Sequence, residues 1–302
     1  MIALAALAAS ASLLLPAWSP DGTRIAWSQA QTAWIADANG GNAKQLGSFD
    51  GLFQLDFVDE DTLLASVNYR LVTVRADGTK ALLATGGPAF ALDRARTHVA
   101  WQAADACPLC HGPILVRALA GGKTVKLGGH AQNIDPSLSP DGTRVVFIRN
   151  FETHGRWERP GGLWVGSTAG GPLRQLVRTG GCPAWSPNGA RIAYWTRAAL
   201  RVVRARGGRS VTVSRLNGSC PQWSPDGTRL AVIGPGAKLF VVDVGAQTTR
   251  AVTGASQGQV SGFAWSPDSS SLLLTGRLRP TQCYRLSVVA ADGSARRTLR
   301  GC

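Results

Sequence analysis

Short apolar runs alternate with turn-forming residues along most of the chain, with Gly, Pro, Asp and Asn between the runs. One such segment, residues 18–27, reads WSPDGTRIAW and has apolar residues on both sides of Pro-Asp-Gly. Proline presets the backbone of a turn, aspartate accepts hydrogen bonds from nearby amides, and glycine takes the left-handed conformation. The segment therefore predicts a β-hairpin.

This segment recurs along the whole chain. Clear copies begin at positions 18, 138, 185, 223 and 265, and degenerate copies begin at positions 57 and 92. Successive copies are 39, 35, 46, 47, 38 and 42 residues apart, close to the spacing of β-propeller blades. A second glycine-containing turn follows each copy. Each unit therefore predicts four antiparallel strands with two tight turns, which is one propeller blade.

The repeat predicts the fold class and the domain organisation. We expect an all-β protein with a single domain over residues 12–302, a seven-bladed β-propeller of four-stranded antiparallel blades. Six or eight blades are the less favoured counts. Residues 1–11 are apolar and end in Ala9-Ser10-Ala11, a small-x-small cleavage pattern, so we expect a secretory signal peptide there. This segment lacks a basic n-region, which a truncated start would explain. A buried amino-terminal strand is the alternative to a signal peptide.

The WSPDGTRIAW segment, with the Asp-Gly hairpin that follows it, resembles the WD40-like PD40 repeats of the TolB propeller family. The resemblance covers residues 16–302 and implies a propeller that works in the cell envelope. The residues ahead of the repeat are too few for the α/β domain that precedes the propeller in TolB, so we do not expect that domain in this sequence. We likewise do not expect the hydrolase domain of peptidases that carry such propellers.

The strand topology predicts which rim of the propeller binds a partner. Both tight turns of every blade lie on one rim, the turn rim. The connections between second and third strands and the links between blades lie on the other, here called the long-loop rim. Its longest connections are expected over residues 102–113, 149–162 and 275–283, and long loops on a rigid scaffold often bind ligands, although neutral insertion is the alternative. The predicted binding residues are Arg149, Glu152, His154, Arg156, Trp157, Arg159, Arg197, Arg277 and Arg279.

Charge narrows the choice of partner. The chain has 32 Lys and Arg against 18 Asp and Glu, a net charge of +14, yet only 17% of its residues are charged. Part of this charge recurs with the repeat and belongs to the scaffold, at Arg24, Arg144, Arg191 and Arg229. The remaining arginines, Arg178 among them, favour an anionic polymer or protein of the cell envelope over nucleic acid. No apolar run reaches the ~18 residues of a membrane span.

All six cysteines are predicted to lie on the long-loop rim. Cys182 and Cys220 occupy the same repeat position, three residues before a tryptophan. Cys283 and Cys302 lie on either side of the Asp292-Gly293 turn. If this is a two-residue turn, residues that face each other across the hairpin have numbers that add to 585, and the numbers of these two cysteines do so. Among the fifteen connectivities that six cysteines allow, we expect Cys107–Cys110, Cys182–Cys220 and Cys283–Cys302. Such a framework favours a periplasmic or secreted protein.

One cysteine motif has two further interpretations. Cys107, Cys110 and His111 match C-x-x-C-H, the attachment motif of c-type haem. Met1 is the only methionine, so His154 would have to be the sixth ligand. Zinc bound by the same residues and a distant histidine is the other possibility. A disulfide-closed loop is favoured over both, so no cofactor and no metal is predicted.

Catalytic motifs are weak in this sequence. Residues 254–258 spell G-x-S-x-G, but they link two blades, whereas a nucleophile elbow needs a strand that enters a helix. Several acids and histidines are expected on the long-loop rim: Asp50, Asp105, Asp135, Glu152, Glu158, His111, His130 and His154. We therefore assign no catalytic residue and expect a monomeric, non-catalytic binding or scaffold module. The alternative is a hydrolase or lyase that acts on an anionic carbohydrate.

Overall fold

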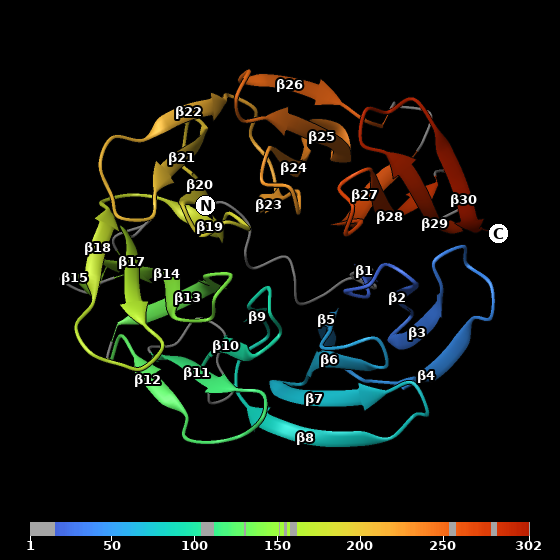
Figure 1. Ribbon diagram of the computed structural model, residues 1–302, viewed down its shortest axis with the longest axis horizontal. Helices are drawn as coiled ribbons and strands as arrows, with labels where there is room; N and C mark the ends of the chain where they lie inside the picture. Colours follow the sequence, from blue (N-terminus) through green and yellow to red (C-terminus); the bar gives the residue numbers. More distant parts are fainter. Residues whose placement is uncertain are drawn as a thin grey trace.

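Seven antiparallel sheets surround a central axis in the computed structural model (Figure 1). The structure describes residues 16–103, 112–129, 131–150, 152–153, 156–157, 162–253, 258–278 and 283–301. Each sheet has four strands that neighbour one another in chain order. The helical content of the described residues is one short 3-10 turn, η1 (Pro235–Ala237). The prediction of an all-β, seven-bladed propeller is confirmed.

The first three blades come from the first half of the chain. Their strands are β1 (Ala17–Trp18), β2 (Arg24–Gln29), β3 (Thr32–Asp37) and β4 (Lys44–Ser48); β5 (Leu52–Phe57), β6 (Thr62–Val67), β7 (Arg70–Arg75) and β8 (Lys80–Thr85); and β9 (Phe90–Leu92), β10 (His98–Gln102), β11 (Ile114–Ala118) and β12 (Val125–Leu127).

Blade four contains an additional two-stranded hairpin between its second and third strands. Its strands are β13 (Gln132–Leu138), β14 (Arg144–Asn150), β17 (Gly162–Ser167) and β18 (Arg174–Val177), and the hairpin is β15 (Glu152–Thr153) with β16 (Arg156–Trp157). Blades five to seven are β19 (Gly181–Trp185), β20 (Arg191–Trp195), β21 (Leu200–Arg204) and β22 (Val211–Ser214); β23 (Gln222–Trp223), β24 (Arg229–Gly234), β25 (Lys238–Asp243) and β26 (Thr248–Ala251); and β27 (Gln259–Trp265), β28 (Ser271–Leu278), β29 (Cys283–Ala290) and β30 (Arg296–Arg300).

The repeated Ser-Pro-Asp-Gly turn is held by its own side chains. In the first copy the Ser19 hydroxyl donates to Asp21 at 2.6 Å and accepts from the Arg24 amide at 2.9 Å. Asp21 also accepts from the backbone and hydroxyl of Thr23 at 3.0 and 2.7 Å. Hydrogen bonds from Ser19 and then Thr23 lower the pKa of Asp21 to about 2. The motif residues therefore form a structural turn, as the sequence indicates.

In blade five the aspartate position of this turn is occupied by Asn188. Its side-chain oxygen still accepts hydrogen bonds from the Ser186 hydroxyl and the Ala190 amide. In blade six, burial raises the pKa of Asp226, but hydrogen bonds from Ser224 and Thr228 and the charge of Arg229 outweigh it and lower that pKa to about 2.

We expect Asp226→Ala to lower the free energy of unfolding by about 1 kcal/mol at neutral pH, given the solvent exposure of this carboxylate. Asp226→Asn keeps the hydrogen-bond acceptor, so its effect should be smaller. Because the pKa of Asp226 is lowered on folding, its charge stabilises the protein above about pH 4, and this contribution is lost as the pH falls towards 2. Urea unfolding at pH 3 and pH 7 checks this; an equal difference from wild type at both pH values would contradict it.

Repeat arginines connect neighbouring blades. Arg24 in blade one forms an ion pair with Asp61 in blade two. Arg229 in blade six donates to the Ser269 carbonyl of blade seven at 2.7 Å, and its guanidinium lies 5.2 Å from the ring centre of Trp265. These contacts give part of the basic charge a structural role, as the repeat predicts.

The ring closes by side-chain packing between complete blades. The first and last blades each keep all four of their strands, so no sheet among the described strands joins the two ends of the chain. Trp27 and Trp34 of blade one stack with ring centres 6.0 Å apart. The guanidinium of Arg300, from blade seven, lies 5.4 and 5.3 Å from those two rings. Leu273 and Leu286 of blade seven pack into the same apolar cluster.

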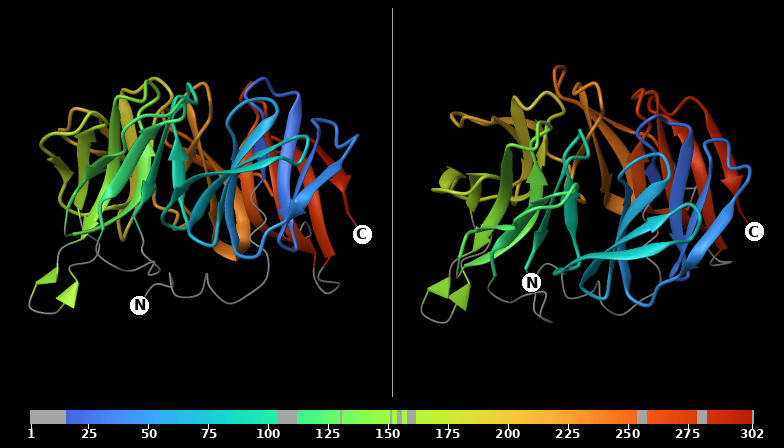
Figure 2. Two further views of the ribbon diagram at one scale, coloured as in Figure 1. Left: turned by 90° about the horizontal axis from the view of Figure 1, so that it is seen from below. Right: turned by 60° about the horizontal axis from the view of Figure 1, so that its bottom comes forward.

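The additional residues of blade seven lengthen its strands, whereas the prediction placed them in a loop. Residues 275–283 were expected to form a long connection, but β28 and β29 stay paired as far as Leu278 and Cys283. The strands themselves are eight residues long, so most of the additional sequence extends the hairpin. The expected loop is therefore much shorter than predicted. In blade four, part of the extra length forms the β15–β16 hairpin, which lies beyond the body of the propeller (Figure 2).

Candidate functional site

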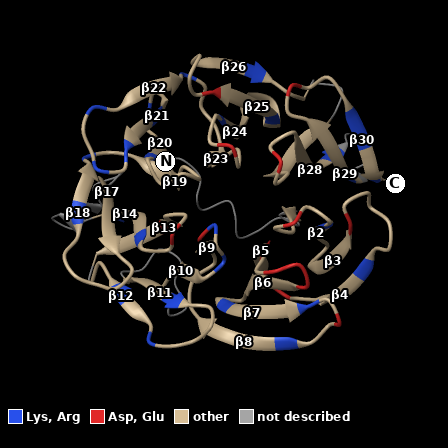
Figure 3. Ribbon diagram, in the orientation of Figure 1, with Lys and Arg blue, Asp and Glu red and all other residues tan. Residues whose placement is uncertain are grey.

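The two rims carry different charges. Twelve of the eighteen acidic residues lie in or directly beside the tight turns of the turn rim: Asp21, Asp37, Asp59, Glu60, Asp61, Asp77, Asp93, Asp141, Asp226, Asp243, Asp268 and Asp292. Those of the first turns gather around the axis (Figure 3). Arginines also lie on the turn rim, Arg24 and Arg229 among them, so its charge is mixed. The described connections of the long-loop rim contain two acids, Asp50 and, in the β15–β16 hairpin, Glu152.

Basic residues follow an arc of the long-loop rim over blades four to seven. This basic arc comprises Arg149, Arg178, Arg197, Arg215, Lys238 and Arg277. Arg178, Arg197 and Arg215 are exposed and lie in connections between strands. The β15–β16 hairpin adds Glu152 and Arg156, one charge of each sign. The described part of this arc therefore presents a strongly positive surface to a partner.

Aromatic rings orient two members of the basic arc. The guanidinium of Arg149 lies 5.3 Å from the ring centre of Trp164, and burial lowers the pKa of Arg149. The guanidinium of Arg277 lies 4.6 Å from the ring centre of Tyr284 and donates a hydrogen bond to the Tyr284 hydroxyl. Stacking on an aromatic face restricts the orientation of a guanidinium. Arg149 and Arg277 are thus held at opposite ends of the arc.

The structure describes only part of the predicted binding set. Arg149, Arg197 and Arg277 lie on the basic arc. Glu152 pairs with Trp157 across the β15–β16 hairpin, where Arg156 also lies, but their side chains are not described. His154, Arg159 and Arg279 lie outside the described residues.

Two members of the arc, Arg215 and Lys238, were not predicted. Each lies in or beside a short connection of the long-loop rim, whereas the prediction followed the long connections. The same strand topology, applied to the short connections as well, would have found both residues.

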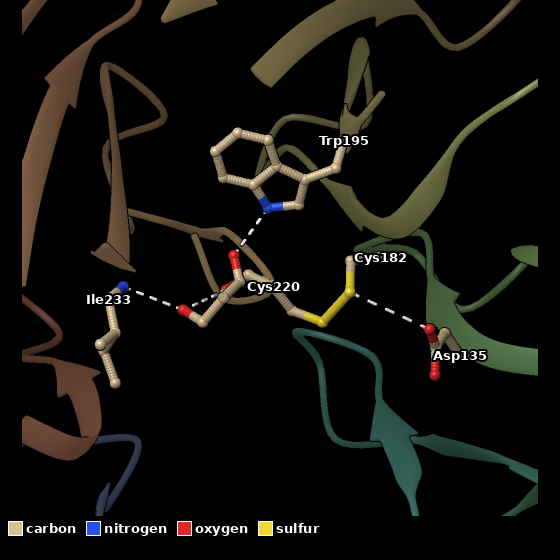
Figure 4. The surroundings of a disulfide bond; sticks show 6 residues. Asp135, Cys182, Trp195, Cys220 and Ile233 are labelled. Atoms are coloured by element: carbon tan, nitrogen blue, oxygen red, sulfur yellow. Dashed lines mark hydrogen bonds between the residues drawn. A yellow bond between two sulfur atoms is a disulfide. The ribbon is translucent and has the colours of Figure 1, made fainter. Parts of the chain in front are cut away.

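A disulfide lies beside the axis and joins two blades. Asp135, Cys182 and Cys220 occupy the same repeat position in blades four, five and six, and each precedes a proline. Cys182 and Cys220 are bonded, with Cα atoms 5.0 Å apart (Figure 4), which supports the predicted pair. The residue before Cys220 is anchored to both blades, because the Ser219 carbonyl accepts from the Trp195 indole at 2.7 Å and its hydroxyl from the Ile233 amide at 2.9 Å.

Asp135 lies next to this disulfide (Figure 4). Its Oδ2 atom is 4.0 Å from the Cys182 sulfur. The residue lies at an irregularity in β13 and has a φ of 52°, in the left-handed region. Part of its surface reaches solvent, but burial of the carboxyl raises the pKa of Asp135 to about 6. Asp135 is therefore partly protonated near neutral pH.

The other predicted disulfides fall at the edges of the described structure. Cys107 and Cys110 lie outside the described residues, as does Cys302. Opposed residues in β29 and β30 have numbers that add to 585 from Ser287 to Val289, as predicted, but the register shifts by one where Leu286 faces Arg300. The constant register on which the pairing of Cys283 with Cys302 was based therefore ends before Cys283.

The described ranges do not test the haem and zinc interpretations. No group of three or more His, Cys, Asp or Glu side chains in them is placed to hold a metal ion. His111, His130 and His154 lie outside these ranges, and so does the C-x-x-C-H motif that begins at Cys107. The same ranges contain no helix that is long and apolar enough to cross a membrane.

On the turn rim, a side chain crosses the axis. Arg94, from the first turn of blade three, donates to the Pro225 carbonyl of blade six at 2.9 Å. These two turns face each other across the centre of the ring (Figure 1). This contact and the ring of aspartates favour the long-loop rim as the face that receives an anionic partner.

Comparisons with known proteins identify the fold. No protein-family model and no curated protein matches the sequence. An oligogalacturonate lyase in complex with manganese has a TM-score of 0.70 at 15% identity, covering 87% of this chain and 85% of its own. A second, from Vibrio parahaemolyticus, has a TM-score of 0.67 at 14% identity, covering 88% and 86%. A TolB-like protein from Agrobacterium tumefaciens has a TM-score of 0.55 at 15% identity, covering 74% and 84%.

Identities this low show a common fold and no shared activity. The chain is a seven-bladed β-propeller, and TolB-like and lyase propellers are among its structural neighbours. The expected likeness to TolB propellers is therefore supported at the level of the fold.

Proposed function

We propose that this protein is an exported, non-catalytic propeller that binds an anionic polymer of the cell envelope through its basic arc. The observation that carries the proposal is the separation of charge between the rims. Exposed Arg178, Arg197 and Arg215 lie on the long-loop rim, whereas most acids lie on the turn rim. A mainly positive surface spread over four blades suits a long, repeating ligand of negative charge.

The scarcity of exposed apolar side chains among the described residues favours a polymer over a folded protein as the partner. Protein interfaces usually contain an apolar centre with aromatic anchors. Among the described residues, the large hydrophobic side chains that are exposed are Leu82 and Val211. Both lie on the fourth strands of their blades, β8 and β22, and neither belongs to the basic arc. An acidic protein surface is the alternative partner, and it would bind mainly through charge.

Export is supported by the disulfide between Cys182 and Cys220. Structural disulfides persist in oxidising compartments and are rare in the cytosol. The signal-like segment at residues 1–11 lies outside the described residues, so export remains part of the proposal. Measurement of the mature amino terminus in protein recovered from the periplasm or the medium tests it.

Removal of three exposed charges should weaken polymer binding. We expect Arg178→Gln, Arg197→Gln and Arg215→Gln together to reduce affinity for polygalacturonate about tenfold at low salt, since three surface charges at ~0.5 kcal/mol each give ~1.5 kcal/mol. The matched control replaces Arg204, Arg206 and Arg209, which are also exposed but lie by the second turn of blade five on the turn rim. The affinity of the wild type should fall as salt is added, and the affinity of the Arg178, Arg197 and Arg215 variant should fall less steeply. Equal losses in the two variants would refute the basic arc as the binding site.

A lyase is the second candidate function. Two structural neighbours are oligogalacturonate lyases, each covered over most of its length. The same polygalacturonate samples, incubated with and without Mn²⁺, should show no new chain ends if the protein only binds. Formation of unsaturated products would replace the non-catalytic proposal with the lyase. Histidines outside the described residues would then be the first to substitute.

A further inference from the structure

Blade seven carries a pair of arginines on the face that packs against blade six. Arg285 of β29 and Arg296 of β30 line a narrow crevice that is partly open to solvent, together with Gln259, Arg277 and backbone near Thr275. Apolar side chains close one side of the crevice: Val260 and Leu274 belong to a cluster that also contains Leu239 and Val241 of blade six. The lining contains no acidic residue.

The two guanidinium groups have buried donors that lack acceptors. Arg296 donates through Nη2 to the Ser287 hydroxyl at 3.1 Å. Its buried Nε and Nη1 atoms, and the buried Nε atom of Arg285, have no hydrogen-bond partner among the described residues. Burial, and then the charge of Arg285, lower the pKa of Arg296, so the two cations repel one another across little solvent. Buried donors without acceptors are unfavourable in a folded protein, and each needs an explanation.

We propose that this crevice binds an oxyanion group, a carboxylate, phosphate or sulfate, between Arg285 and Arg296. Such a group carries at least two oxygens that can accept charge-assisted hydrogen bonds from two guanidinium forks. Its negative charge would also offset the repulsion between the arginines. A chloride ion offers a single centre and matches this arrangement less well. The site is separate from the surface charges of the basic arc, although Arg277 belongs to the lining of both.

Thermal unfolding with added anions tests this site. Sodium phosphate, sulfate and acetate are titrated separately at constant ionic strength, with sodium chloride as the balancing salt. We expect the melting temperature of the wild type to rise in a saturable manner with at least one of the three, since a ligand that binds only the native state stabilises it. The comparison of acetate with phosphate and sulfate identifies the preferred oxyanion.

Substitutions then assign the effect to the crevice. Arg285→Gln and Arg296→Gln should each raise the half-saturating concentration at least tenfold, and in anion-free buffer Arg285→Gln should raise the melting temperature because it relieves the repulsion. Arg285→Lys keeps the charge, loses the fork and should weaken binding by a smaller factor; it serves as the second variant if a Gln variant does not fold. Arg178→Gln is the control and should bind as the wild type does.

The proposal is overturned if none of the three anions gives a saturable rise, or if the rise is the same in wild type and both Gln variants. Failure of polymer binding in the arc variants leaves this result unaffected, because the probes here are small ions and the substituted residues differ.

Discussion

Replacement of both Cys182 and Cys220 by serine is expected to lower the free energy of unfolding by about 3–4 kcal/mol. The disulfide closes a loop of 38 residues between two blades, and cross-links of this span restrict the unfolded chain by roughly that amount. Blades five and six should separate more readily without it, because the bond is formed between the innermost strand of one blade and the link that enters the next.

Urea unfolding of the wild type and the double serine variant, both without reductant, checks this expectation. The variant should have a midpoint well below that of the oxidised wild type. The Cys283→Ser variant is the control, since it leaves this cross-link intact. A double variant as stable as the oxidised wild type would show that the bond contributes nothing to the stability of the ring.

Asp135→Asn is expected to stabilise the protein by about 2 kcal/mol at pH 7.5. The folded-state pKa of about 6 lies above the ordinary value of 3.8. The folded protein therefore holds this proton more tightly than the unfolded chain does. The protein therefore loses stability as the pH rises from about 4 to about 6, where the unfolded chain is ionised and the folded carboxyl still holds its proton. The full cost is present above pH 6, and it is absent near pH 3, where both states are protonated. The shift corresponds to nearly 3 kcal/mol at most, reduced here because the residue is partly exposed.

Unfolding experiments at pH 3 and pH 7.5 measure this effect. The variant should exceed the wild type in stability at pH 7.5 and equal it near pH 3. Asp50→Asn removes an exposed carboxylate from the same rim and controls for the change in net charge. If Asp135→Asn destabilises the protein at both pH values, the carboxylate makes favourable contacts that outweigh its burial.

The fold was accessible from the sequence because each blade repeats the same local chemistry. A serine and a side-chain acceptor two residues later form the same turn in different blades. The acceptor is Asp21 in blade one and the asparagine Asn188 in blade five. The pairing of Cys182 with Cys220 followed from the same repeat, since equivalent positions in adjacent blades lie side by side around the axis. Blade number and strand order therefore needed no information from distant contacts.

Other features depend on contacts that no repeat encodes. The shift in register at Leu286 arises from an irregularity within one hairpin, and the sequence has no turn residue that marks it. The raised pKa of Asp135 depends on burial beside a neighbouring blade. The arginine pair at Arg285 and Arg296 becomes visible only when two strands place their side chains in one crevice.

Hydrogen exchange in the presence of polygalacturonate tests the central claim most directly. The amides of residues 178–180, 196–199 and 215–220 lie on the long-loop rim beneath the basic arc, and residues 205–210 form a turn on the opposite rim. We predict that the polymer slows exchange in the first three segments and leaves the fourth unchanged. Slower exchange on the turn rim alone, with the long-loop segments unaffected, would contradict the assignment of the binding surface.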